Sequence, residues 1–407
     1  MKRSAPLLSL LLCVTLLGLP LLAAPGGRSD SRGRTPGVEL AALATQITGI
    51  AISPLLGVSV VGCYKWWQAE TPAEKAALPW YAQPEFWALG LLLVLAVAVK
   101  DAAGASLPPG WKKPLDVADT VENKISGLVA AGAVIPSLVA LGAMLMTDSA
   151  AGPEVETVGT GLAMLPIAAF DLSWVVTVLM VPLSIAVFIV VWLASHAINV
   201  LILLSPWGAV DAALKAGRTA LLAVITGTAI VDPVVGATIS VVVILFAWLV
   251  AGWSFRLTVF GAVFCWDTFT LRRRRFEVLA DGNKLFLGRA VGGVPIRTYG
   301  RLHQEPAGRL VFRYRPWLVL PERMLEIPSA GLVVGRGMFY SEVLGHDAAA
   351  DKLRTLLLLP PRYVGHEQLF ARTYAISGTC DIGLRRAWGW LKESLGFRGA
   401  TAEPAPA

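Results

Sequence analysis

Two long tracts without charged side chains constrain this sequence more than any other feature. The first runs from Ser173 to Leu204 and contains no Asp, Glu, Lys or Arg. The second begins at Pro233 and is interrupted only by Arg256 before it reaches Trp266. A helix needs about 20 consecutive apolar residues to cross the hydrocarbon core of a bilayer. Both tracts exceed that length, so they predict helices that span a membrane.

The composition points the same way. Charged residues make up 15% of the 407 residues, against about 25% in ordinary soluble domains. The deficit lies before residue 272, so we expect an α-helical multi-pass membrane domain of about six spans over residues 39–271. The predicted spans are Leu40–Cys63, Phe86–Val99, Ile125–Thr147, Ser173–Leu204, Trp207–Val231 and Val234–Trp266.

The segments before and after the folded part have simple patterns. Residues 1–27 have a basic start, an apolar middle and small residues at the end, as a secretory signal peptide does. An uncleaved first apolar segment is the alternative. The composition of residues 28–38 is typical of a flexible linker, and residues 398–407 are expected to form a disordered tail.

A run of four arginines follows the last predicted span. Basic residues next to a span mark its cytoplasmic side, and they attract anionic lipid headgroups. We therefore expect an inner-membrane protein with a cytoplasmic C-terminal part that contacts the lipid bilayer and its anionic headgroups. The chain has a net charge of +7, but we do not expect it to bind nucleic acid, because the composition lacks the context of a nucleic-acid-binding protein. The candidate lipid contacts are Arg272, Arg273, Arg274 and Arg275.

Two places in the apolar part carry residues that break helices. Polar and helix-breaking residues at membrane depth must face protein or a cavity, because lipid cannot satisfy freed backbone groups. The first place lies inside Leu40–Cys63, and that segment therefore either spans the membrane or re-enters on the same side. The candidate helix breaks are Ser53 and Pro54, and Ser205 and Pro206.

After Arg275 the sequence changes to short runs, many of which alternate apolar and polar residues, as strands do. An amphipathic helix is predicted over Cys380–Leu395. We expect residues 272–397 to form a cytoplasmic β-rich domain, which resembles a pleckstrin-homology-like barrel in architecture. The strand-like runs are Phe276–Leu287, Arg309–Tyr314, Trp317–Leu320, Met324–Ile327, Gly331–Val334, Met338–Leu344 and Leu353–Leu359.

The stretches Thr48–Gly57 and Asp116–Gly127 together resemble an uncharacterised family of bacterial multi-pass membrane proteins, a domain of unknown function. The resemblance covers roughly the first 150 residues. It implies a bacterial inner-membrane protein, and it implies no catalytic residues. The C-terminal domain lies outside it.

Polar side chains within the apolar part are the candidate functional residues. Two groups of three have helical spacing, so each group is expected to share one helix face. Inside a helix bundle these faces would line a polar pathway, because ionisable groups at membrane depth are costly and usually functional. At the membrane interface they would instead be solvated and form local ion pairs, and a lone membrane histidine is often only structural. The candidates are Asp116, Asp119, Asn123, Asp171, His196, Asn199, Asp211, Lys215 and Arg218.

Enzyme signatures are poor, and no catalytic residue is predicted. The sequence has no GxSxG, HExxH or P-loop motif, and its four cysteines have no CxxC spacing. No metal or other cofactor is expected. One predicted function is a transporter or channel-like protein for a small solute or lipid, with a regulatory β domain. The alternative is a membrane-anchored scaffold or sensor whose β domain binds a partner protein or lipid headgroups.

Overall fold

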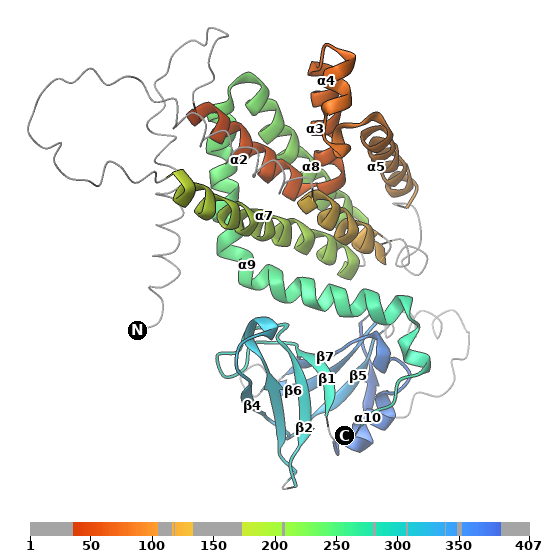
Figure 1. Cartoon of the computed structure of the whole chain (residues 1–407). Coiled ribbons are helices and arrows are strands. Elements are labelled where there is room, and N and C mark those ends of the chain that lie inside the picture. Colours follow the sequence, from red (N-terminus) through yellow and green to blue (C-terminus); the bar gives the residue numbers. More distant parts are fainter. Residues whose placement is uncertain are drawn as a thin grey trace, which may run out of the picture. The chain divides into compact units, whose positions relative to one another are not determined.

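The structure, a computed structural model, has two compact units that divide between Ser254 and Phe255. Unit 1 precedes this boundary and is helical in its described part, whereas unit 2 contains a β-sheet (Figure 1). The predicted signal peptide, most of the predicted linker and the predicted tail lie outside the described residues. The described residues are 36–104, 116–117, 119–132, 173–205, 208–279, 282–306, 308–337, 339–347 and 352–383.

Several helices of unit 1 begin with a proline at the first helical position, where the missing N–H and the fixed φ are tolerated well. One of these, the short helix Pro72–Ala77, also has a capping box between Thr71 and Glu74 at its start. Residues 116–117 and 119–132 are also helical and are called the 116–132 helix below. The labelled helices are α2 (Pro36–Ile52), α3 (Pro54–Gln68), α4 (Pro72–Ala77), η1 (Trp80–Ala82), α5 (Pro84–Gly104), α7 (Ser173–Leu204), α8 (Gly208–Val231) and α9 (Pro233–Phe269), which continues into unit 2.

The helix break at Ser53 separates α2 from α3. Ser53 has a φ of −137°, and Pro54 is the first residue of α3. The carbonyl of Ile52 accepts a hydrogen bond from the hydroxyl of Ser195 in α7. The two helices therefore meet at a bend (Figure 1), where a side chain of α7 satisfies a carbonyl that the break leaves without a helical partner.

The expectation of about six membrane spans is wrong. In the described part of the chain, two helices are long and apolar enough to cross a membrane, Pro182–Leu204 and Pro233–Phe269. The break at Ser53 divides Leu40–Cys63 between helices of 17 and 15 residues. The apolar part of α5, Pro84–Val97, is also short.

Two further predicted spans fail or lie largely outside the described chain. The span predicted over Trp207–Val231 corresponds to α8, which carries Asp211, Lys215 and Arg218 in its first half. Charged residues at this density exceed what an apolar span tolerates. The span predicted over Ile125–Thr147 is described only as far as residue 132.

Unit 2 is built on one mixed eight-stranded sheet in the order β4-β3-β2-β1-β7-β6-β5-β8. Neighbouring strands are antiparallel except β5 and β8, which are parallel. This sheet is compatible with the β-rich C-terminal domain that the sequence predicts. Its strands are β1 (Asn283–Leu287), β2 (Tyr299–Gln304), β3 (Leu310–Tyr314), β4 (Arg323–Ile327), β5 (Val333–Arg336), β6 (Ser341–Asp347), β7 (Lys352–Leu359) and β8 (Thr379–Asp381).

Two details of the predicted β domain differ from the structure. Trp317–Leu320 is not a strand, and Pro316–Leu318 forms a tight turn, η4, inside which Trp317 has non-helical dihedral angles. The prolines at 316 and 321 bracket this run and cannot donate to a sheet ladder. The start of the helix predicted over Cys380–Leu395 is a strand in the structure, because Cys380 and Asp381 belong to β8 and pair with β5. The predicted helix beyond residue 383 lies outside the described chain.

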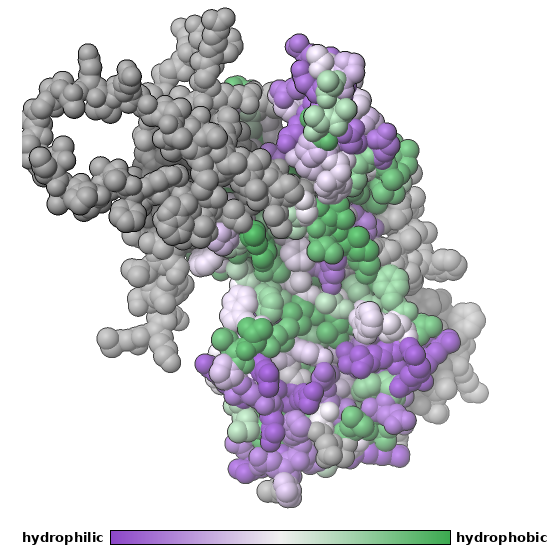
Figure 2. All heavy atoms as spheres, viewed as in Figure 1, coloured by the Kyte–Doolittle hydropathy of each residue, from purple (hydrophilic) through white to green (hydrophobic). Residues whose placement is uncertain are grey.

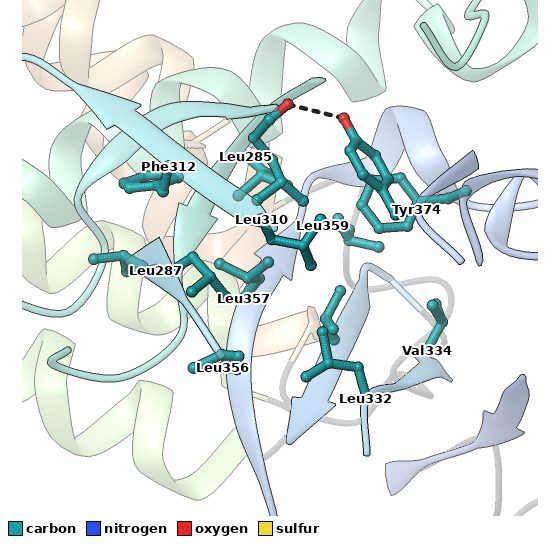
Figure 3. Close-up of a cluster of buried hydrophobic side chains, with 14 of the residues drawn as sticks. Leu285, Leu287, Leu310, Phe312, Leu332, Val334, Leu356, Leu357, Leu359 and Tyr374 are labelled. Carbon is teal, nitrogen blue, oxygen red and sulfur yellow. Dashed lines mark hydrogen bonds between the residues drawn. The ribbon is translucent and has the colours of Figure 1, made fainter. Parts of the chain in front are cut away.

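One face of the sheet carries the core of unit 2 (Figure 3). Leucines at alternate positions of β1 pack there with residues of β3 and β7 and with α10 (Glu367–Thr373). At the end of α10 the Tyr374 hydroxyl donates to the Leu302 carbonyl over 2.8 Å and accepts from Asn283 Nδ2, also at 2.8 Å. The core includes Leu285, Leu287, Phe312, Val334, Leu357, Leu359 and Phe370.

The opposite face of the sheet packs against the last part of α9, Phe255–Phe269. The ring of Phe260 lies 4.9 Å from that of Phe286 in β1 and 6.1 Å from that of Tyr340. These residues of α9 therefore belong to the fold of unit 2. The part of α9 that remains, Pro233–Ser254, has no charged residue and is about 33 Å long at 1.5 Å per residue.

Candidate functional site

Three helices of unit 1 bring most of the candidate polar residues together in what we call the polar junction. Asn123 Oδ1 of the 116–132 helix lies 3.0 Å from His196 Nδ1 of α7. Asn199 of α7 accepts a hydrogen bond of 2.7 Å from Arg218 of α8. Each interaction joins a different pair of helices, and a third closes the triangle. We define the polar junction as the six residues that these interactions join, together with Asp116 and Asp211, which precede Asp119 and Lys215 at helical spacing. The six joined residues are Asp119, Asn123, His196, Asn199, Lys215 and Arg218.

The third interaction is an ion pair between α8 and the 116–132 helix. Lys215 Nζ lies 3.6 Å from Asp119 Oδ2, and these side chains are 26% and 22% exposed. Asp116 and Asp211 are buried more deeply, at 4% and 3% exposed. The polar junction thus has a partly solvated pair at one place and two buried carboxyl groups elsewhere.

His196 is enclosed by aromatic and small residues as well as by Asn123. Its ring stacks on Trp192, with centroids 5.1 Å apart and planes inclined by 11°. Gly127 allows the 116–132 helix to approach closely, since a Cβ there would lie 2.8 Å from Trp192 Cε2. Among the described residues, His196 Nε2 has no hydrogen-bond partner. The packing therefore fixes the imidazole ring through Nδ1 and through stacking.

The polar junction is suited to holding opposite charges and amides together between helices. Within the described residues, no group of three or more His, Cys, Asp or Glu side chains could hold a metal ion. Ser205 follows α7 directly, whereas the candidates Asp171 and Pro206 lie outside the described chain. The sequence predicted the helical spacing of these residues but not which helices meet.

The arginines that follow α9 are exposed and partly engaged with unit 2. Arg272–Arg274 forms a 3₁₀ turn, and Arg272 Nη1 lies 4.0 Å from Asp267 Oδ1. Arg275 donates a hydrogen bond of 2.9 Å to the Thr270 carbonyl at the end of the helix. His366 contacts the Arg273 carbonyl at 2.9 Å through Nε2. The run is thus anchored at several points and keeps exposed guanidinium groups.

Sequence reasoning missed a second candidate site, a row of basic residues on the α9-bearing face of the sheet. Lys284 in β1 pairs with Arg301 in β2, and Arg301 pairs with Arg313 in β3. All three residues are exposed. We call Lys284, Arg301 and Arg313 the basic row. Alternation of exposed and buried positions within β2 is the sequence signal that could have identified them. Gly300 and the charged positions make this alternation weak in the sequence.

The basic row lies in a strongly positive environment. Partial burial lowers the pKa of Lys284, and the charges of Arg301, Arg362 and Arg272 lower it further. Residues 255–407 contain 22 Lys and Arg against 13 Asp and Glu, a net charge of +9, whereas the whole chain carries +7. Hydrophilic side chains accordingly cover much of the visible surface of unit 2 (Figure 2). A net positive charge of this size favours the approach of anions.

We found no match to this chain among protein-family models, curated proteins or solved structures. The resemblance to a bacterial membrane family therefore stays a prediction, as does the pleckstrin-homology-like architecture of unit 2. The polar junction and the basic row are the two arrangements on which a functional proposal can rest.

Proposed function

We propose that the protein is a membrane-anchored binding module. In this proposal, α7 and the Pro233–Ser254 part of α9 anchor it in a bilayer. The basic row of unit 2 binds the phosphate groups of anionic lipids on the cytoplasmic side. The observation that carries the proposal is the direct cross-strand pairing of Lys284, Arg301 and Arg313.

Three like charges opposite one another on adjacent strands destabilise a sheet that has no ligand. An anion that bridges them removes this repulsion and gains charge-assisted hydrogen bonds. Guanidinium groups suit this role, because their planar set of donors matches the oxygens of a phosphate. The neighbour of Arg313 across the next strand is Met324, which is exposed, so the row ends beside an apolar side chain.

The membrane anchor is supported by the exposed side of α9. Val242, Phe246 and Leu249 stand at helical spacing and are 61%, 65% and 71% exposed. An apolar face of this kind is typical of a surface covered by lipid or by a partner. The remaining 22 residues from Pro233 to Ser254 match the thickness of a bilayer core, about 30 Å. Arg272–Arg275 lies close enough to this span for the positive-inside rule to favour a cytoplasmic unit 2.

The test measures stabilisation of unit 2 by lipid headgroups. The full chain is reconstituted in nanodiscs of phosphatidylcholine with or without phosphatidylglycerol, and its thermal unfolding is followed by circular dichroism. A ligand that binds only the folded state raises its stability, so phosphatidylglycerol should raise the melting temperature. High salt should reduce this rise, because exposed charges are screened.

A double variant with a matched control makes the test specific. Arg301→Gln with Arg313→Gln should abolish the rise in melting temperature caused by phosphatidylglycerol. Arg309→Gln should keep it, because Arg309 lies outside the row and pairs with Glu305 at 2.7 Å. An equal melting temperature of the wild-type chain in both lipids would contradict the proposal.

The polar junction favours a second candidate function, the movement of a small ion or solute through unit 1. Buried carboxyl groups such as Asp116 and Asp211 are costly and often mark such a pathway. Proteoliposomes that contain the full chain would show flux of protons or small cations, and Asp211→Asn would reduce the flux while the protein remains folded. If the wild-type chain shows no flux above empty vesicles, the polar junction has a structural role only.

A further inference from the structure

The loop between β3 and β4 exposes an unbroken run of large apolar side chains. We call Pro316–Pro321 the apolar loop. Trp317 and Leu318 are 49% and 44% exposed, and Val319 and Leu320 are 81% and 44% exposed. Four consecutive residues of this kind in water are unfavourable, because apolar area removed from water is the main source of folding stability.

The backbone of the apolar loop holds these side chains away from the core. Trp317 has a φ of 55° and Leu318 has a φ of 64°. Bulky residues rarely adopt the left-handed region, and strained conformations of this kind cluster at functional sites. The prolines at both ends prevent pairing with a neighbouring strand. The conformation thus exposes the side chains at the expense of local backbone energy.

The position of the apolar loop links it to the end of the apolar part of α9. The Trp317 ring lies 4.8 Å from the ring of Phe255. Phe255 is the last residue of the uncharged run of α9, and Arg256 follows it. Under the proposed function, Phe255 marks the depth at which the chain leaves the bilayer, and Trp317 shares that depth.

Exposed arginines flank the apolar loop on both sides. Arg315 precedes it and Arg323 follows it, and both side chains are exposed. Arg315 also continues the strand that carries Arg313 of the basic row. Apolar residues framed by basic residues complement the surface of an anionic bilayer, whose phosphates lie outside its acyl chains.

We propose that the apolar loop inserts into the same bilayer that holds α9. Trp317, Leu318, Val319 and Leu320 enter the boundary between headgroups and acyl chains, and Arg315 and Arg323 contact the phosphates. Tryptophan suits this zone because its ring is amphipathic. This inference rests on the proposed anchoring by α9 and adds a second membrane contact to unit 2.

The test compares the environment of three single nitroxide labels on the full chain. The four native cysteines are replaced by alanine, and one cysteine is introduced per variant, at Val319→Cys, Leu249→Cys or Leu353→Cys. Each variant is reconstituted in nanodiscs that contain phosphatidylglycerol, and its melting temperature is checked against the unlabelled chain. Leu249 reports on α9, and Leu353 is an exposed position in β7, which lies three strands from β3 in the sheet. Electron paramagnetic resonance then measures collisions with oxygen, which enters lipid, and with a nickel chelate, which stays in water.

The inference expects lipid-like collisions at Val319 and Leu249 and water-like collisions at Leu353. Lipid-like collisions at Leu249 with water-like collisions at Val319 would overturn the inserted loop and leave the anchor intact. Water-like collisions at Leu249 would overturn the anchor and the inference together. Protection of Val319 from both reagents would show that protein covers the apolar loop, through a second copy or a partner, and would also overturn the inference.

Discussion

Arg362 Nε lies 2.7 Å from Asp267 Oδ2, and both side chains are almost fully buried, at 5% and 0% exposed. This ion pair joins the end of α9 to the 3₁₀ turn that follows β7. Two more basic residues, Arg272 and Lys284, lie near this pair, and the charges of Arg362 and Arg272 lower the pKa of Lys284. Asp267 therefore neutralises the most buried part of a positive region.

Replacing Asp267 by Ala should destabilise unit 2 by about 3–5 kcal/mol, because it leaves the buried guanidinium of Arg362 without its partner. Chemical denaturation of the full chain in detergent would measure the loss. Glu305→Gln removes one partner of an exposed pair with Arg309 and should change stability by less than about 1 kcal/mol. Asp267→Leu with Arg362→Met should restore much of the loss. Similar effects of Asp267→Ala and Glu305→Gln would contradict this account.

The polar junction predicts unequal effects within α8. Asp211→Ala truncates a side chain that is 3% exposed, and the cavity that it leaves should destabilise unit 1 by more than about 1 kcal/mol. Lys215→Ala removes a side chain that is 26% exposed and should cost about 1 kcal/mol or less. The melting temperature of the full chain in detergent separates these cases. The double variant Asp119→Lys with Lys215→Asp should recover the stability that each of these single substitutions loses, because it restores the ion pair in reverse. No recovery would indicate that other neighbours fix the positions of the two side chains.

Two glycines should respond to alanine in opposite directions. Gly127→Ala places a Cβ 2.8 Å from Trp192 Cε2, so it should displace the ring that stacks on His196 and cost about 1–3 kcal/mol. A Cβ at Gly217 in α8 has open space within 4 Å in the described chain. Gly217→Ala should therefore stabilise the helix by about 0.5–1 kcal/mol. Circular dichroism melts of both variants in the same detergent check the difference, and a destabilised Gly217→Ala would count against the packing described for α8.

The basic row predicts that lipid binding weakens at high pH. Partial burial and the nearby charges of Arg301, Arg362 and Arg272 lower the pKa of Lys284 below its ordinary value of 10.5. As pH rises through this lowered pKa, Lys284 loses the charge that contacts the phosphate. The stabilisation by phosphatidylglycerol should fall in that range, at a pH below 10.5. Lys284→Arg should keep the stabilisation there, because arginine stays protonated.

Without lipid, the contribution of Lys284 to stability changes with pH in the opposite direction, and this difference provides an internal check. Between the lowered pKa of folded Lys284 and the ordinary pKa of the unfolded chain, the unfolded state binds more protons. The contribution of Lys284 to stability therefore rises with pH across that window. A fall in stability across that window without lipid would show that tyrosines whose pKa is raised by burial, such as Tyr299 and Tyr340, control the response in place of Lys284.

Helical spacing in the sequence predicted which polar residues share a face, but not which faces meet. Asp211, Lys215 and Arg218 follow one another at helical intervals, and the structure places Lys215 beside Asp119. That pairing depends on how helices pack, which spacing within one helix does not encode. The number of spans was overestimated for a related reason, since average hydropathy ignores the break at Ser53 and the charges of α8.

The β-rich character of unit 2 was visible because its strands alternate and are separated by turn residues. The predicted run Arg309–Tyr314 corresponds to β3 (Leu310–Tyr314). The predicted run Met324–Ile327 corresponds to β4 (Arg323–Ile327). The basic row was not visible, since it arises from the register of three strands and β2 was not predicted. Trp317–Leu320 has the composition of a strand, and only the prolines on either side indicate a loop.

The separation of Asp267 and Arg362 along the chain has a consequence for synthesis. Arg362 follows Asp267 by 95 residues, and ribosomes add about 5–20 residues per second. For roughly 5 to 20 s, the end of α9 therefore exists before the turn that neutralises its carboxylate has been translated. During that interval the end of this helix is open to a chaperone or an insertion machinery, with Arg362 not yet there to pair with Asp267.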